Sequence, residues 1–340
     1  MPLNYLFFFG LGIIGVLIVW SVWLSRKATR EMPAAGEMFD TSLGTLHALV
    51  KGEEVPKGPP PMILIHGSMT NALDMDIDLS GRFQDTRRLF IPDRPGHGFS
   101  ERPQDGWRLD VQAAMIHEAA SKAGISRPIV LGQSFGGAVA LRYALDYPDD
   151  VAGLVLVAPV THPWPGGVTW YNRVGLNPYY GWLFRRTFIP LYARFGAKRA
   201  VERSLRGSAL TSRYHQRTRV ALTFRPKTFH ANNEDITRLY EQLYAQSRRY
   251  DEITIPCEAL AGTHDMTVVT TVHARAMRQA MQGFKLTVID GGGHALHHQY
   301  PEAVATAVTR LDARVAAAAR SPLQGAFRRL VSVFPGSAQG

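Results

Sequence analysis

A serine set among glycines is the first residue of this sequence that could do chemistry. In the stretch GQSFG, Ser134 follows an apolar run and precedes a helix-like segment. Glycines at these positions permit a sharp turn from a strand into a helix, and such an elbow exposes a serine hydroxyl at the edge of a sheet. The pattern predicts that Ser134 is a nucleophile, and the alternative is a glycine-rich turn with an idle serine.

A serine nucleophile needs a base, and the base needs a carboxylate to orient it. Behind such an elbow the acid comes next along the chain and the histidine last. His294 follows an apolar run and a glycine turn in TVIDGGGHALHH, and Asp265 follows the preceding apolar run in AGTHD. The other place for an acid, after the run GLVLVA, holds no Asp or Glu before Glu202. We therefore predict a catalytic triad of Ser134, Asp265 and His294.

Acyl transfer also requires two backbone N–H groups that stabilise an oxyanion. The residue after the nucleophile, Phe135, supplies one of them. The second comes from the loop after the apolar run MILIH, where we assign it to the amide of Ser68, with the amide of Met69 as the alternative. His66 in the same loop is expected to make structural hydrogen bonds.

Short apolar runs alternate with helix-like segments through most of the chain. Helices are predicted over 109–123, 136–146 and 301–318. The runs are typical of buried strands in a mostly parallel sheet, so the helices should cover both of its faces. The predicted strands are 45–50, 62–66, 88–92, 128–132, 153–158, 258–261 and 285–289.

The alternation stops after Pro159, where about 90 residues precede the next strand signal, too many for an unstructured loop. We expect a helical lid there. The chain then divides into a transmembrane anchor (5–24), a linker (25–44), the first part of the core (45–160), the lid (161–252), the second part of the core (253–320) and a C-terminal tail (321–340).

The N-terminal segment has the character of a membrane span. Positions 5–24 carry no charge, and 20 apolar residues cross about 30 Å of hydrocarbon as a helix. A signal peptide is the alternative, although the leader MPLN lacks the usual basic residues and no small-residue cleavage site follows. Arg26, Lys27 and Arg30 follow the span, which favours a single-pass anchor with the remaining chain on the cytoplasmic side.

The net charge of +10 is concentrated in the lid, where residues 161–252 hold 16 Lys and Arg against 6 Asp and Glu. This surface would suit anionic lipid, or it is simply solvated. No nucleic-acid-binding motif accompanies it. Aromatic side chains of the lid could line a tunnel, enter a bilayer interface or form the lid's own core. They are Trp164, Trp170, Tyr171, Tyr179, Tyr180, Trp182 and Phe184.

Five motifs in order, IHGSMTN, DRPGHGFSERP, GQSFGG, GTHD and GGGH, resemble the α/β-hydrolase superfamily, in its HG-x subgroup with a lid. The resemblance spans residues 61–318. It implies the α/β-hydrolase fold, a mostly parallel sheet with helices on both faces and an inserted helical lid. It also implies that Asp93 and His97, in the turn after the fourth strand, are structural.

Departures from related families narrow the expected chemistry. Similar epoxide hydrolases and haloalkane dehalogenases use an aspartate where this chain has Ser134, and HGSMTN lacks the HGSGPG loop of carbon–carbon bond hydrolases. What remains resembles membrane-anchored, monoacylglycerol lipase-like serine esterases, which act on a hydrophobic or lipid-like ester without metal or organic cofactor. The alternatives are a cofactor-free perhydrolase or haloperoxidase, an acyltransferase, and a ligand-binding protein of hydrolase fold.

Overall fold

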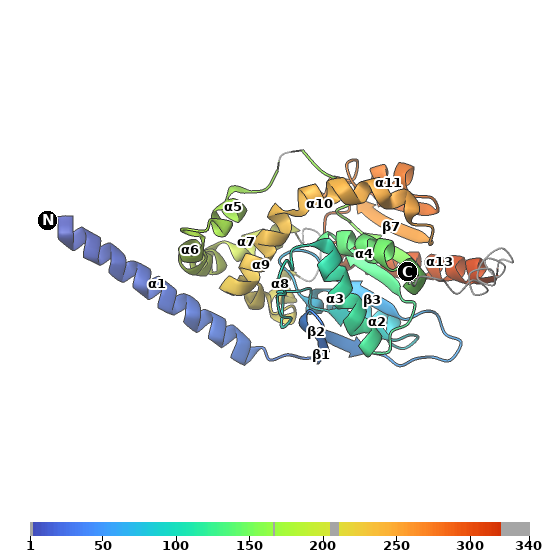
Figure 1. Ribbon diagram of the computed structural model, residues 1–340, viewed down its shortest axis with the longest axis horizontal. Coiled ribbons are helices and arrows are strands. Elements are labelled where there is room, and N and C mark those ends of the chain that lie inside the picture. The colour runs from blue at the N-terminus through green and yellow to red at the C-terminus, as the bar shows by residue number, and fades with distance from the viewer. Residues whose placement is uncertain (1–2, 166, 205–210, 321–340) are drawn as a thin grey trace, which may run out of the picture.

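The computed structural model describes residues 3–165, 167–204 and 211–320 (Figure 1). An eight-stranded sheet with the strand order β1-β2-β4-β3-β5-β6-β7-β8 forms its centre. β2 pairs antiparallel with β1 and β4, and the other pairings are parallel, which confirms the predicted mostly parallel sheet. The strands are β1 (Glu37–Thr41), β2 (Gly44–Lys51), β3 (Met62–Ile65), β4 (Leu89–Pro92), β5 (Ile129–Gln133), β6 (Gly153–Val157), β7 (Cys257–Gly262) and β8 (Phe284–Ile289).

Helices cover both faces of this sheet. α3 (Leu109–Lys122), α4 (Phe135–Asp146) and α11 (Ala274–Ala280) lie on one face, and α2 (Ala72–Phe83), α12 (Leu296–Gln299) and α13 (Pro301–Arg320) lie on the other. Successive residues of a strand point to opposite faces, so one strand supplies both cores.

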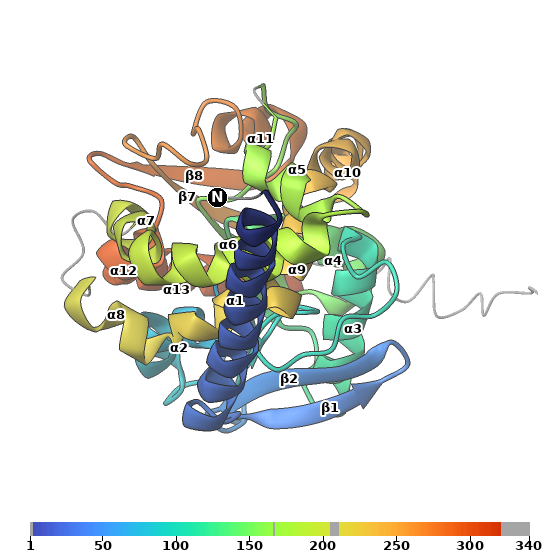
Figure 2. The ribbon, with the colours of Figure 1, turned by 90° about the vertical axis from the view of Figure 1, so that its left-hand side faces the viewer.

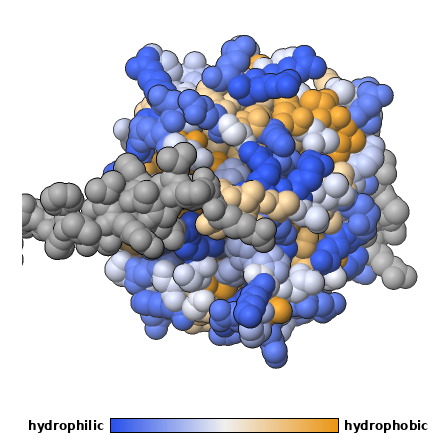
Figure 3. Space-filling view, turned by 90° about the vertical axis from the view of Figure 1, so that its right-hand side faces the viewer, coloured by the Kyte–Doolittle hydropathy of each residue, from blue (hydrophilic) through white to orange (hydrophobic). Residues whose placement is uncertain are grey.

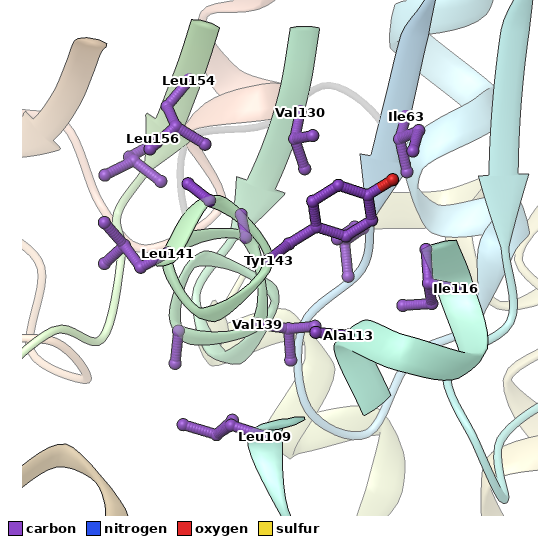
Figure 4. Packing of buried hydrophobic residues seen from close by; sticks show 14 of the residues in the cluster. Ile63, Leu109, Ala113, Ile116, Val130, Val139, Leu141, Tyr143, Leu154 and Leu156 are labelled. Carbon is purple, nitrogen blue, oxygen red and sulfur yellow. The ribbon is translucent and has the colours of Figure 1, made fainter. Parts of the chain in front are cut away.

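The first core can be followed in Figure 4, where Val139 and Tyr143 of α4 and Ile116 of α3 gather beneath Ile63 and Val130 of the sheet. All five side chains are at most 1% exposed. Burying an aliphatic side chain of this size contributes about 1.5–3 kcal/mol, so this layer holds β3 and β5 firmly in register.

Helix α2 was not among the predicted helices, because its sequence ALDMDIDLSGRF alternates acids with apolar residues and imitates a strand. The structure instead buries Met75, Leu79 and Phe83, which recur at helical spacing. Asn71 caps the first turn by accepting a hydrogen bond from the Leu73 amide at 3.0 Å. One acid of the helix, Asp74, is thereby buried.

The predicted linker over 25–44 is wrong in part. Helix α1 (Leu3–Glu31) continues to Glu31, and β1 then pairs antiparallel with β2. The ring of Phe39 in β1 packs edge-on against Phe90 of β4, with 5.5 Å between ring centroids. This apolar contact explains why a short, mostly exposed segment forms an edge strand.

The segment between β6 and β7 folds into a helical layer, as predicted for the lid. Its helices are α5 (Trp170–Leu176), α6 (Gly181–Phe195), α7 (Ala197–Ser204), α8 (Thr211–Arg217), α9 (Pro226–Thr237) and α10 (Leu239–Gln246). A 3₁₀ turn over Val220–Phe224 joins α8 to α9. The predicted tail over 321–340 lies outside the described residues.

Helix α1 is long and apolar enough to cross a membrane over Tyr5–Glu31, as an anchor or a signal sequence. It lies across α6 and projects beyond the lid (Figures 1 and 2). Ser21 and Ala28 are buried against the lid, while Phe7 and Phe8 are largely exposed. The opposite face of the molecule is mostly hydrophilic, with only small scattered apolar patches (Figure 3).

Candidate active site

The predicted nucleophile stands at the turn between β5 and α4. Ser134 has φ +53° and ψ −117°, a strained conformation for a residue with a side chain. A Cβ on Gly132 would lie 2.3 Å from the carbonyl oxygen of Gly136, so only glycine lets the helix return this close to the strand. The Ser134 amide donates to the carbonyl oxygen of Val157 at 3.0 Å, which ties the elbow to β6.

The three residues predicted for the triad lie within hydrogen-bond distance of one another. His294 Nε2 is 3.0 Å from Ser134 Oγ, and His294 Nδ1 is 2.8 Å from Asp265 Oδ2. Asp265 follows β7 and His294 follows β8, so the carboxyl ends of three parallel strands bring the side chains together. Such a chain of hydrogen bonds can move a proton from a hydroxyl to an imidazole that a carboxylate orients.

Asp265 is fixed before any substrate binds. Its Oδ1 accepts hydrogen bonds from the amides of Thr267 and Val268, both at 2.8 Å. Its side chain is 1% exposed, whereas the His294 side chain is 14% exposed. The carboxylate is therefore held inside the protein, and the imidazole reaches the cavity.

The loop after β3 lies against the elbow. A Cβ on Gly67 would lie 2.3 Å from Gln133 Oε1 and 3.2 Å from Ser134 Cβ, so glycine permits this approach. Ser68 and Phe135 both line the cavity that contains Ser134.

The amides of this loop differ in their partners. The Met69 amide, the alternative oxyanion donor, already donates to Asn232 Oδ1 of α9 at 3.0 Å. Among the described residues, the amides of Ser68 and Phe135 donate to no protein acceptor. Phe135 is the first residue of α4, where N–H groups point out of the helix.

Arg94 is buried and contacts both the loop after β3 and the first residue of α4. It was not among the predicted site residues. Arg94 donates through Nε to the carbonyl oxygen of His66 and through Nη2 to that of Gly67, both at 3.1 Å. Its guanidinium also lies over the Phe135 ring, 4.3 Å from the centroid. Because the C=O and N–H of one peptide point in opposite directions, fixing the Gly67 carbonyl also fixes the Ser68 amide.

The charge of Arg94 is balanced from the lid. Asp235 of α9 accepts from Arg94 Nη1 at 2.7 Å, and neither side chain is exposed. Burial lowers the pKa of Arg94, and the carboxylate of Asp235 opposes this shift. A fork-shaped cation is well suited to bridge two carbonyls and a carboxylate. The signal for Arg94 was present in DRPGHGFS, but nothing in the sequence pairs that motif with Asp235 or with Asn232.

His66, Asp93 and His97 have structural surroundings. His66 Nε2 accepts from the Arg94 amide at 2.9 Å. Burial, assisted by the charge of Arg94, lowers the pKa of His66 to about 3, so the ring is neutral. Asp93 accepts from the amides of Ala72 and Phe99 at 2.8 and 2.9 Å, and His97 is fully buried.

A cavity of about 590 Å³ opens above Ser134, between the sheet and the lid. Its lining is mainly apolar and includes Val160, Phe188, Phe229, Leu239 and Val268. A largely apolar chamber of this size suits a hydrophobic small molecule.

The seven aromatic side chains singled out in the lid divide into three groups. Trp164 and Tyr171 line the cavity. A core role is wrong for four others, because Trp170, Tyr179, Tyr180 and Trp182 are exposed. Phe184 is partly buried and stacks on Phe188, with 4.6 Å between ring centroids. The single cysteine, Cys257, is buried.

Comparison with known proteins places this geometry in a family. Residues 62–307 match the model of the alpha/beta hydrolase family. Haloalkane dehalogenase 2 of Mycobacterium tuberculosis is 34% identical over 128 residues, which cover 36% of this chain and 42% of that protein. The 2-hydroxymuconate semialdehyde hydrolase of Pseudomonas putida is 36% identical over 126 residues, again 36% of this chain and 42% of that protein.

These curated relatives are matched over less than half of their length. Among solved structures, a thermophilic esterase from Thermogutta terrifontis superposes with a TM-score of 0.62 at 19% identity, covering 82% of this chain and 98% of that one. This similarity supports the fold alone. Because the family model covers most of the core, including the elbow and the loops that carry Asp265 and His294, the chain belongs to the alpha/beta hydrolase family.

Proposed function

We propose that this hydrolase is a serine esterase that cleaves a hydrophobic carboxylic ester through an acyl-enzyme. The observation that carries the proposal is the unbroken chain of hydrogen bonds from Ser134 Oγ through His294 to Asp265. A serine hydroxyl is a weak nucleophile at neutral pH, and an adjacent oriented base is what makes it reactive.

In the first half of the reaction His294 Nε2 takes the proton of Ser134 as the oxygen attacks the ester carbonyl. The carboxylate of Asp265 holds the imidazole in the tautomer with a proton on Nδ1 and stabilises the imidazolium. The imidazolium then protonates the leaving alcohol, and the acyl group stays on Ser134. In the second half His294 activates water, which releases the acid and regenerates the serine.

The amides of Ser68 and Phe135 are the proposed oxyanion donors. Both border the cavity beside Ser134, and Arg94 fixes the peptide that carries the Ser68 amide. Loss of one such donor typically lowers kcat by about 10²–10³. Arg94 is therefore a positioning residue in this mechanism.

The substrate class follows from the cavity and from the surface around it. Apolar residues dominate the chamber. The exposed rings of the lid lie on α5, on α6 and in the turn between them, and α6 packs on α1. On α6 the guanidinium of Arg186 lies 4.3 Å from the Trp182 ring centroid. Paired aromatic and basic side chains suit the headgroup region of an anionic membrane.

We therefore propose α1 as a single-pass anchor, with the basic lid against the same membrane and a lipid-like ester entering from it. Arg26, Lys27 and Arg30 follow the apolar span, and because basic residues flank spans mostly on the cytoplasmic side, we propose that side for the catalytic part.

To test the proposal, the full chain is placed in detergent micelles, and its hydrolysis of p-nitrophenyl esters is measured for acyl groups from acetyl to palmitoyl. Turnover that rises with acyl length and is absent in Ser134→Ala supports the proposal. Repeating the assay with glycerol present separates hydrolysis from acyl transfer, because a hydrolase yields mainly the free acid and a transferase mainly the glyceryl ester. Turnover that Ser134→Ala retains, or none on any ester by the folded wild type, contradicts it.

A further inference from the structure

A second group of histidines and carboxylates lies on the wall of the cavity that contains the triad. Asp74 of α2 and His297 and His298 of α12 are 2%, 2% and 6% exposed. All three residues line the cavity. Figure 2 shows α2, α8 and α12 in one region of the molecule, and α2 contacts both of the other helices.

Both imidazoles of this group face the carboxylate of Asp74. His297 Nε2 is 3.1 Å from Asp74 Oδ2, and His298 Nε2 is 3.0 Å from Asp74 Oδ1. One ligand atom from each residue lies within 4.8 Å of the others. Metal–nitrogen and metal–oxygen bonds of about 2.0–2.2 Å give ligand–ligand separations of roughly 3–3.5 Å, so these atoms need only a short movement to surround one ion.

The surroundings have the pattern that supports metal ligands in proteins. Asp78 Oδ2 is 2.7 Å from His298 Nδ1, which orients the ring with Nε2 toward Asp74. The Tyr214 hydroxyl of α8 donates to Asp74 Oδ1. A carboxylate behind a ligating histidine and a hydrogen bond to a ligating carboxylate are common outer-shell features of metal sites.

Hydrogen bonding of the two imidazoles with Asp74 and Asp78 is the alternative account. His297 Nδ1 is buried and has no hydrogen-bond partner among the described residues, and because the proposed ligand atom is Nε2, it stays unpartnered with or without an ion. Burying polar groups this deeply costs free energy when their bonds are only partly made, and neither the apolar core nor the triad requires these side chains.

We propose that Asp74, His297 and His298 bind a divalent transition-metal ion. Two imidazoles and one carboxylate suit Zn²⁺, Co²⁺ or Mn²⁺ better than Ca²⁺ or Mg²⁺, which prefer oxygen ligands. The ion joins α12, just after His294, to α2, just after the oxyanion loop, and Tyr214 extends this link to the lid. It acts as a clamp around the substrate cavity, separate from the triad.

The experiment uses the full chain in detergent, stripped with a chelator and titrated with Zn²⁺. The expected result is one tightly bound ion per chain by elemental analysis, together with a rise of several degrees in Tm. Co²⁺ in place of Zn²⁺ should give the visible absorption of nitrogen and oxygen ligands. Ser134→Ala should bind the ion equally, which separates this result from the fate of the esterase proposal.

His297→Gln is the decisive variant, because it removes one ligand and leaves the contacts of His298 with Asp74 and Asp78 in place. It should lose the bound ion and the rise in Tm, while the control His117→Gln, on α3, keeps both. Folded wild type that binds no stoichiometric ion overturns the proposal. Equal binding by wild type and His297→Gln also overturns it, since the ion is then adventitious.

Discussion

Two histidine–carboxylate groups border one cavity, and they differ in the second hydrogen-bond partner of the histidine. In the first, His294 bridges Asp265 and a serine hydroxyl, with 2.8 Å and 3.0 Å to its two partners. In the second, His298 bridges Asp74 and Asp78, at 3.0 Å and 2.7 Å. An imidazole between a carboxylate and a hydroxyl can pass a proton onward, whereas one held between two carboxylates is fixed in place.

The difference lies in the elements that carry the two groups. The triad stands on loops after β5, β7 and β8, where a rigid parallel sheet sets its spacing. The second group joins two helices of one layer and is closed by the lid. The first arrangement suits chemistry and the second suits attachment of neighbouring segments, and the following changes test that division.

The largest effect is expected from His294→Ala. Without the base, kcat for ester hydrolysis should fall by about 10⁶, the loss typical of removing a triad histidine. His298→Ala removes no group from the proton path and should act mainly on Tm, with a far smaller loss of kcat. Steady-state kinetics and thermal unfolding of both variants check the contrast, and equal losses of kcat would remove the distinction.

Asp265→Asn should lower kcat by about 10⁴. The amide cannot hold His294 in the tautomer that leaves Nε2 free to accept the serine proton. Fold and substrate binding should be retained, because Asn can still accept from the amides of Thr267 and Val268. The measurement is kcat and KM with a chromogenic ester, and a kcat within tenfold of wild type would exclude Asp265 as the orienting acid.

Arg94→Lys should lower kcat by about 10²-fold with little change in KM. Lysine keeps the charge beside Asp235 but cannot bridge the two loop carbonyls, so the Ser68 amide loses its fixed direction. Tm measured in parallel accounts for lost stability. If the folded variant keeps its kcat, Arg94 has no role in orienting the oxyanion loop.

The smallest effect concerns His273, another buried histidine of this cavity. Burial lowers its pKa to about 4, and its Nδ1 accepts from the amide of Thr161 at 3.2 Å. The unfolded chain binds a proton near pH 6.5 and the folded chain does not, so the contribution of the neutral ring is complete above pH 6.5 and is lost as pH falls toward 4. The free energy involved is about 3 kcal/mol.

Denaturant unfolding of wild type and His273→Gln at pH 7 and pH 4.5 measures this contribution. The free energies of unfolding of the two proteins should differ less at pH 4.5 than at pH 7. Only wild type loses stability through protonation of His273 in the unfolded chain, and all other titratable groups are shared. A difference that does not change with pH would mean that His273 has the same pKa in the folded and the unfolded chain.

The sequence could predict those features that have a local signal, and it could not predict contacts that only tertiary packing creates. Each strand of the sheet except β1 was predicted, because continuous apolar runs are a local signal, and the three triad residues follow directly from strand ends. Helix α2 imitates a strand locally, and only tertiary packing selects the helix. Asp74 and His298 are 224 residues apart in the sequence, so no local pattern predicts their contact. Arg94 follows a core strand and Asp235 lies in the lid, so only tertiary structure brings them together and no sequence pattern predicts their contact.

Labelling of the full chain by a fluorophosphonate probe, with wild type beside Ser134→Ala, tests the central claim most directly. The probe reacts with a serine only where a base activates it and an oxyanion site receives the developing charge. Labelling of wild type that disappears in Ser134→Ala is the result we predict. No labelling of folded wild type, with membrane lipid present to open the lid, or equal labelling of both proteins would contradict the account of Ser134 as an activated nucleophile.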